Sequence, residues 1–184
     1  MHEIKWGMIG CGNVTEKKSG APAINKIQHA SLVAVMARNK EKTEDYAQRH
    51  NVPRCYTNVD ELIADDEVNA IYIATPPNVH LEYAAKAIKA GKAVYIEKPM
   101  ARNFAECEEI NRLGREYGVP VFVAYYRRTL PYFVKLKELI DSGVIGEIRL
   151  VNILLHWQPY DEEVGENPKP RWRVFPEISG GGHF

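Results

Sequence analysis

Residues 4–15 read Ile-Lys-Trp-Gly-Met-Ile-Gly-Cys-Gly-Asn-Val-Thr, and this stretch decides the fold. Its first half is a short apolar run, typical of a buried strand, and Ile9 leads directly into a turn with two glycines. Such glycines allow a tight turn and let the backbone approach a pyrophosphate. Thr15 replaces the third glycine of a G-x-G-x-x-G pattern, a position that serves helix packing more than phosphate approach. The candidate cofactor-binding residues of this turn are Gly10, Gly12, Asn13 and Val14.

Two glycines after a strand are often only a turn, so the surrounding pattern has to support the interpretation. From residue 4 to about 123, short apolar runs alternate with longer helical patterns, which indicates successive βαβ units and a doubly wound parallel sheet. The expected strands are Lys5–Ile9, Leu32–Ala37, Cys55–Thr57, Ala70–Ala74, Ala93–Glu97 and Pro120–Ala124. The expected helices are Glu41–His50, Val59–Ala64, His80–Ala90 and Asn103–Tyr117. Residues 1–124 are therefore predicted to form an α/β, Rossmann-type domain that binds NAD(P).

The pattern changes after residue 124. We expect a helix over Pro131–Asp141, a strand over Ile148–Leu155 and a long proline-rich loop over residues 159–178. Residues 125–184 are therefore predicted to be a connecting helix and the truncated beginning of a second, α+β domain for substrate binding and dimerisation. One strand cannot complete a sheet, so the sequence is expected to be part of a longer protein.

Composition excludes several classes of protein. Lys plus Arg and Asp plus Glu are both 24, so no overall field favours nucleic acid or an anionic membrane. The N-terminus lacks a signal-peptide pattern and no apolar run could span a bilayer, which predicts a soluble, cytoplasmic protein. The three cysteines and six histidines are scattered, so neither a disulfide framework nor a metal site is expected.

The end of the second expected strand bears on the choice of cofactor. About 25 residues after Gly12, NAD-specific folds often place a carboxylate that binds the ribose 2′-hydroxyl. This sequence has Met36-Ala37-Arg38-Asn39 there. Arg38 offers a cation suited to a 2′-phosphate, so NADP is favoured over NAD, with Arg38 and Asn39 as candidate binding residues. The alternative is that Arg38 is a solvated residue at the end of a strand.

Three further stretches make the assignment more specific. They are Ala-Thr-Pro-Pro-Asn-Val-His at residues 74–80, Tyr-Ile-Glu-Lys-Pro-Met at 95–100 and Tyr-Tyr-Arg-Arg at 125–128. With the glycine turn they resemble the Gfo/Idh/MocA oxidoreductase family, the relatives of glucose-fructose oxidoreductase and inositol dehydrogenase, over essentially the whole chain. The resemblance implies hydride transfer between a nicotinamide cofactor and a hydroxyl or keto carbon of a sugar, polyol or inositol-like substrate.

The resemblance also implies site residues. Those expected beside the cofactor are Thr75, Pro76, Asn78, His80, Glu97, Lys98, Tyr126 and Arg127. Lys98 is the expected catalytic residue, through electrostatics and hydrogen bonding to the substrate oxygen, and its bond to Pro99 is expected to be cis. Trp172 and Arg173 resemble a substrate-side loop. The alternatives are a stiff loop at residues 75–77, a surface ion pair at residues 97–98, and ordinary packing for the other aromatic and arginine residues.

In the family, an Asp and His acid-base pair follows the segment that matches residues 180–184, and His183 does not take that role. The resemblance therefore implies a cofactor site without a complete active site, and a homo-oligomer for the full-length protein. Two other functions remain open: a non-catalytic dinucleotide-binding module, and a doubly wound domain that binds a mononucleotide or an adenosylated methyl donor. The Glu97-Lys98-Pro99 stretch argues against the latter.

Overall fold

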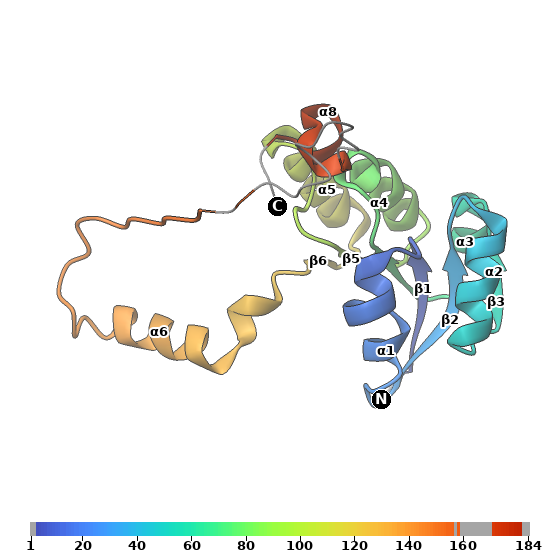
Figure 1. Cartoon of the computed structure of the whole chain (residues 1–184), viewed down its shortest axis with the longest axis horizontal. Coiled ribbons are helices and arrows are strands. Elements are labelled where there is room, and N and C mark those ends of the chain that lie inside the picture. The colour runs from blue at the N-terminus through green and yellow to red at the C-terminus, as the bar shows by residue number, and fades with distance from the viewer. Residues whose placement is uncertain (1–2, 157, 159–170, 182–184) are drawn as a thin grey trace. The chain divides into compact units, whose positions relative to one another are not determined.

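A computed structural model describes residues 3–156, 158 and 171–181 (Figure 1). They divide into two compact units. The first holds the chain up to Ala124 together with the segment from Trp172 onward, and the second holds the chain from Tyr125 to Arg171. The division after Ala124 falls at the predicted end of the Rossmann-type domain. The segment from Trp172 packs with the first unit, although the sequence grouped it with the second.

The first unit is built on one sheet of six parallel strands, in the order β3-β2-β1-β4-β5-β6. The strands are β1 Ile4–Ile9, β2 Ala30–Met36, β3 Arg54–Tyr56, β4 Ala70–Ile73, β5 Ala93–Ile96 and β6 Val121–Val123. This confirms the predicted Rossmann-type fold, with strand ends displaced by at most two residues. The strand order reverses between β1 and β4, and open α/β sheets bind ligands at the carboxyl ends of strands at such a point.

Helices connect the strands as expected, except after the glycine turn. The helical elements of the first unit are η1 Thr15–Ser19, α1 Ala21–Ile24, α2 Lys40–Arg49, α3 Val59–Ala64, η2 Pro77–Val79, α4 His80–Lys89, α5 Phe104–Tyr117, η4 Trp172–Val174 and α8 Pro176–Ser179. The connection from β1 to β2 contains two short pieces, of which η1 is a π-helix. Asn39, Asn58 and Asn103 cap the following helices α2, α3 and α5 through their side chains.

Buried side chains form a cluster on each face of the sheet, because successive residues of a strand point to opposite faces. One cluster joins the strands to α3, α4 and α5, and its fully buried members include Ile71, Ile73 and Ile110. The other joins them to α1 and α2, and includes Tyr46 and Tyr72. Both layers hold the carboxyl ends of β1 and β4 in fixed positions relative to each other.

The second unit differs from its prediction. It contains η3 Tyr126–Thr129 and α6 Pro131–Asp141, and α6 matches the predicted helix. The strand predicted over Ile148–Leu155 was wrong: the run has no regular secondary structure, and its ends are 48% and 78% exposed. No strand of the described residues pairs with it, and an apolar run becomes a strand only with a partner for its backbone groups. Residues 159–170 of the predicted loop lie outside the described residues, and the loop prediction was wrong near its end, where η4 and α8 are helical.

His80 joins two loops at the carboxyl edge of the sheet. It is fully buried at the start of α4. Its Nε2 lies 2.8 Å from the Thr75 carbonyl oxygen, and its Nδ1 lies 3.1 Å and 3.2 Å from those of Pro99 and Met100. Burial lowers the pKa of the His80 imidazole, an effect that the three carbonyl oxygens oppose. The two ring nitrogens therefore face carbonyl oxygens of two different loops, the one after β4 and the one after β5.

The lowered pKa of His80 predicts a pH dependence of stability. The unfolded chain binds a proton at this histidine below its ordinary pKa of 6.5, whereas the folded chain does so only at lower pH. The stabilisation is therefore complete above about pH 6.5 and is lost as the pH falls toward the pKa of the folded state. Urea unfolding between about pH 5 and pH 7 should show this slope, and His80→Gln should flatten it. The exposed His156 provides the control, because His156→Gln should keep the slope; an unchanged slope in the His80 variant would contradict the assignment.

Candidate cofactor-binding site

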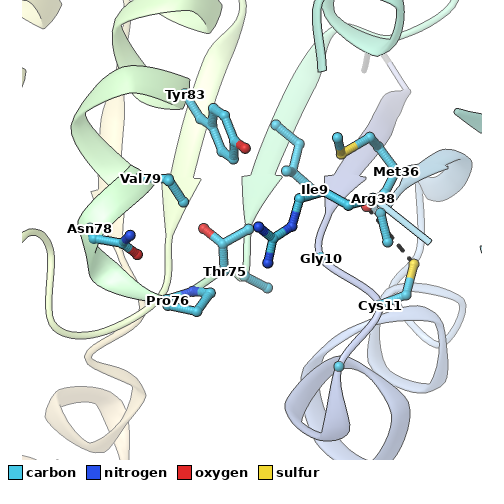
Figure 2. Close-up of a pocket in the computed structure, with 13 residues that line it drawn as sticks. Ile9, Gly10, Cys11, Met36, Arg38, Thr75, Pro76, Asn78, Val79 and Tyr83 are labelled. Carbon is cyan, nitrogen blue, oxygen red and sulfur yellow. Dashed lines mark hydrogen bonds between the residues drawn. The ribbon is translucent and has the colours of Figure 1, made fainter. Parts of the chain in front are cut away.

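An open pocket lies at the carboxyl ends of β1, β2 and β4 (Figure 2). Three segments line it: the end of β1 with the glycine turn (residues 9–12), the end of β2 (residues 36–38), and the loop after β4 with the first turns of α4. The sequence predicted several of these residues. The structure brings together Gly10, Gly12, Arg38, Thr75, Pro76 and Asn78.

The glycine turn passes close to the end of β4. Gly10 has a φ of +111°, and a Cβ atom there would lie 2.5 Å from the Ala74 carbonyl oxygen, so only glycine fits. Gly12 is different, because a Cβ atom there would meet nothing within 4 Å. The backbone at Gly12 is therefore open to the pocket, and a ligand can approach it closely.

The Thr15 side chain stabilises the glycine turn through hydrogen bonds to its backbone. This side chain is fully buried, and its hydroxyl donates toward the carbonyl oxygens of Gly10 at 3.0 Å and Gly12 at 2.9 Å. The close packing expected of a third glycine occurs instead at Gly20, where a Cβ atom would lie 2.4 Å from the Thr15 carbonyl oxygen. Thr15 thus replaces the missing glycine with two polar contacts to the turn.

Polar groups enter the pocket from the ends of β2 and β4. Figure 2 shows the Arg38 side chain reaching across the pocket toward Thr75. The Thr75 hydroxyl is buried and has no hydrogen-bond partner among the described residues. A buried hydroxyl without a partner is costly, so a ligand that hydrogen-bonds it would gain affinity. Burial raises the pKa of the Cys11 thiol in the same pocket to about 12, so it stays protonated there.

Glu97 and Lys98 follow β5 at the same edge of the sheet, but they do not line this pocket. The half-buried Glu97 carboxylate accepts a hydrogen bond of 2.6 Å from Tyr72, whose hydroxyl lies 2.6 Å from that of Ser19. Lys98 is exposed and forms no ion pair with the acidic residues of the described chain. The Lys98–Pro99 peptide bond is cis, as predicted.

Other predicted residues lie elsewhere. Asn39 caps α2, accepting a 2.9 Å hydrogen bond from the Lys42 amide, and it does not line the pocket. His80 is buried beneath the loops. The Arg173 guanidinium lies over the Trp172 ring at 4.5 Å from its centroid, away from the pocket lining. Asn13 and Val14 follow the turn without lining the pocket, and Tyr126 and Arg127 belong to the second unit, so their roles stay predictions.

Two lining residues that were not predicted lie at helical spacing. Tyr83 lies four residues after Val79, one helical turn further along, and both line the pocket. Tyr72 gave no such signal, because its partner Glu97 follows a different strand, β5. Among the described residues, no group of three or more His, Cys, Asp or Glu side chains is placed to hold a metal ion. None of the helices in the described part is long and apolar enough to cross a membrane.

Comparison with known proteins agrees with this geometry. Residues 4–125 match the Gfo/Idh/MocA family, described as an oxidoreductase family with an NAD-binding Rossmann fold. Oxidoreductase P35 of Formosa agariphila is 49% identical over 181 residues, which cover 98% of this chain and 56% of that protein. The chain thus spans about half the length of this relative.

Two solved structures are similar at 26% sequence identity. Scyllo-inositol dehydrogenase from Lactobacillus casei with bound NAD(H) and scyllo-inositol has a TM-score of 0.71, covering 79% of this chain and 43% of that one. A 3-ketoreductase from Actinomadura kijaniata, in complex with TDP-benzene and NADP, has a TM-score of 0.73, covering 80% and 46%. The match over residues 4–125, on a six-stranded parallel sheet with a glycine turn at its switch point, shows that the chain belongs to the Gfo/Idh/MocA oxidoreductase family.

Proposed function

We propose that this chain is the cofactor-binding part of an NAD(P)-dependent oxidoreductase acting on a hydroxyl or keto carbon of a sugar, polyol or inositol-like substrate. The observation that carries the proposal is the pocket itself. The open backbone at Gly12, the Arg38 guanidinium and the unpartnered Thr75 hydroxyl all face one space at the switch point of the sheet. A dinucleotide offers a pyrophosphate, a ribose and a base to such a set of groups.

The residues fit a dinucleotide in a definite order. The glycine turn receives the pyrophosphate, while Arg38 and Thr75 lie on the side that takes the adenosine half. Glu97 and Lys98 lie beyond β4 on the other side, where the nicotinamide half is expected to extend. When bound, the nicotinamide supplies the hydride chemistry. Asn78 and Pro76 form the pocket wall, and we propose that Tyr126, Arg127, Trp172 and Arg173 complete the site in the full-length protein.

Lys98 is the proposed catalytic residue. Its exposed ammonium has no carboxylate partner in the described part of the chain, so it can hydrogen-bond the substrate oxygen. A cation there stabilises negative charge that develops on the oxygen as the carbinol hydrogen leaves. Tyr72 holds the adjacent Glu97 carboxylate, which fixes the backbone from which Lys98 projects.

NADP is the preferred cofactor within this proposal. The pocket presents Arg38 and no carboxylate at residues 36–38, the place from which a ribose 2′-hydroxyl is usually bound. A guanidinium suits a 2′-phosphate, because it donates several charge-assisted hydrogen bonds to phosphate oxygens. The two similar structures contain NAD(H) in one case and NADP in the other, so residues of this chain must decide between the cofactors.

Gly12→Val tests the position of the pyrophosphate. The added side chain would enter open space in the free protein, so the unfolding temperature should hardly change. The same side chain would occupy the space that the pyrophosphate needs, so NADPH affinity, measured by nicotinamide fluorescence, should fall more than about tenfold. Gly10→Val is the contrast, because its side chain would collide with the Ala74 carbonyl and lower the unfolding temperature. Normal NADPH binding by a folded Gly12 variant would argue against a cofactor at this turn.

Arg38→Asp tests the preference for NADP. Reversing this charge should weaken NADPH at least about tenfold more than NADH, because the carboxylate repels a 2′-phosphate and can accept from a 2′-hydroxyl. The measurement is the pair of dissociation constants from fluorescence titration. Lys26→Asp, an exposed substitution of the same charge outside the pocket, should affect both cofactors alike. Equal losses for the two cofactors in the Arg38 variant would show that this residue does not bind the 2′-phosphate.

Lys98→Met, made in the full-length protein, separates an enzyme from a binding module. Turnover on a panel of polyols and sugars should fall by about 10² to 10⁴, the usual contribution of a positioned polar group. Cofactor affinity should stay within about threefold of the original, because the lysine acts on the substrate oxygen. If the unsubstituted full-length protein binds NADPH and turns over no member of the panel, the non-catalytic module is the better description.

A further inference from the structure

A side-chain hydroxyl enters the helix that follows the glycine turn. Residues 13–19 are helical, and the stretch from Thr15 widens into the π-helix η1. Tyr46, from the middle of α2, places its hydroxyl at the break before α1. It donates to the Thr15 carbonyl oxygen at 3.0 Å and accepts from the Ala21 amide at 3.2 Å. A side chain that inserts into the hydrogen-bond ladder of a helix is a known cause of a kink or break.

The insertion is closely packed. Tyr46 is 1% exposed, and its hydroxyl is satisfied on both sides, as a buried hydroxyl should be. A Cβ atom at Gly20 would lie 2.5 Å from the Tyr46 hydroxyl and 2.4 Å from the Thr15 carbonyl oxygen. The glycine therefore makes room for the hydroxyl, and the two residues form a matched pair.

Thr15 passes this contact on to the turn. Its carbonyl is held by Tyr46, while its hydroxyl holds the carbonyls of Gly10 and Gly12. The next residue, Glu16, is paired with Arg49 and lies 3.2 Å from His50, both at the C-terminal end of α2. Helix α2 thus fixes both Thr15 and Glu16, the residues that follow the turn. The carbonyl groups of Gly10 and Gly12 in the turn are held by the Thr15 hydroxyl.

We propose that Tyr46 is a positioning residue for the pyrophosphate: through Thr15, its hydroxyl holds the Gly10–Gly12 turn in the conformation that receives the cofactor. This inference rests on the proposed function. Tyr46 does not line the pocket, so it acts only through the backbone of the turn. If Tyr46 served only in core packing, its phenyl ring would suffice, and loss of the hydroxyl would not change cofactor affinity.

The test is Tyr46→Phe in the 184-residue chain, with dissociation constants for NADPH, for ADP-ribose, which keeps the pyrophosphate, and for adenosine 2′-phosphate, which lacks it. We expect the first two ligands to weaken about tenfold, the usual effect of one lost hydrogen bond to an ordered group, and the third to change less than about twofold. Tyr56→Phe is the matched control. It removes a tyrosine hydroxyl that donates to Asp65 at 3.1 Å, outside the pocket.

A second pair of variants keeps the inference testable if the Tyr46 variant does not fold. Thr15→Val removes the hydroxyl that holds the turn and should weaken NADPH and ADP-ribose alike, whereas Thr15→Ser should retain their affinity. Where Tyr46→Phe and Thr15→Val both fold, the double variant should lose less NADPH binding free energy than the sum of the two single losses. Both substitutions interrupt the same chain of hydrogen bonds from Tyr46 through Thr15 to the turn.

The outcomes separate the inference from the proposed function. If the unsubstituted chain binds neither NADPH nor NADH, the proposed function is wrong and the inference falls with it. If the unsubstituted chain binds NADPH and Tyr46→Phe binds it within about twofold, Tyr46 does not position the turn. Equal weakening of all three ligands, or equal losses in Thr15→Ser and Thr15→Val, would likewise reduce Tyr46 and Thr15 to general structural support.

Discussion

The close approach of the turn after β1 to the end of β4 is the constraint on which the site depends. At Gly10 there is room for a hydrogen atom and not for a carbon atom beside the Ala74 carbonyl oxygen. Because β1 and β4 are adjacent and parallel, both strands end at the same edge of the sheet, and the glycine turn comes to lie beside Thr75. The next residues of both segments then face one pocket, which Arg38 enters from the other side.

Buried polar side chains maintain this arrangement. Thr15 holds the glycine turn, His80 joins the loops after β4 and β5, and Tyr72 reaches the carboxylate after β5. If its partner moved, each of these buried groups would lack a hydrogen bond, which costs free energy. Each contact therefore favours one loop conformation over others. Hydrophobic packing fixes the strands and helices, while these hydrogen bonds fix the loops that a ligand would touch.

The strand predicted over Ile148–Leu155 shows the limit of local pattern. The apolar run over residues 148–155 has the composition of a strand, and the described residues provide no neighbour for its backbone. β-Propensity describes how well a residue fits a pleated, partly buried surface, and it has no effect where that surface is missing. The strands of the first unit obey the same rule, because each is flanked by a parallel partner.

The sequence by itself determined the order of strands and helices along the chain, the glycine turn and the cation at position 38, because these follow from periodicity and from the conformations that glycine favours. It predicted Asn39 and His80 beside the cofactor, and these stay predictions; in the structure Asn39 caps α2 and His80 is buried between loops. Only the tertiary structure decided these roles, together with the Tyr46–Thr15 and Tyr72–Glu97 contacts, whose partners are 31 and 25 residues apart. Local pattern carries information about neighbours in the chain, and a polar side chain's role is set by whichever distant group the fold places within hydrogen-bonding distance.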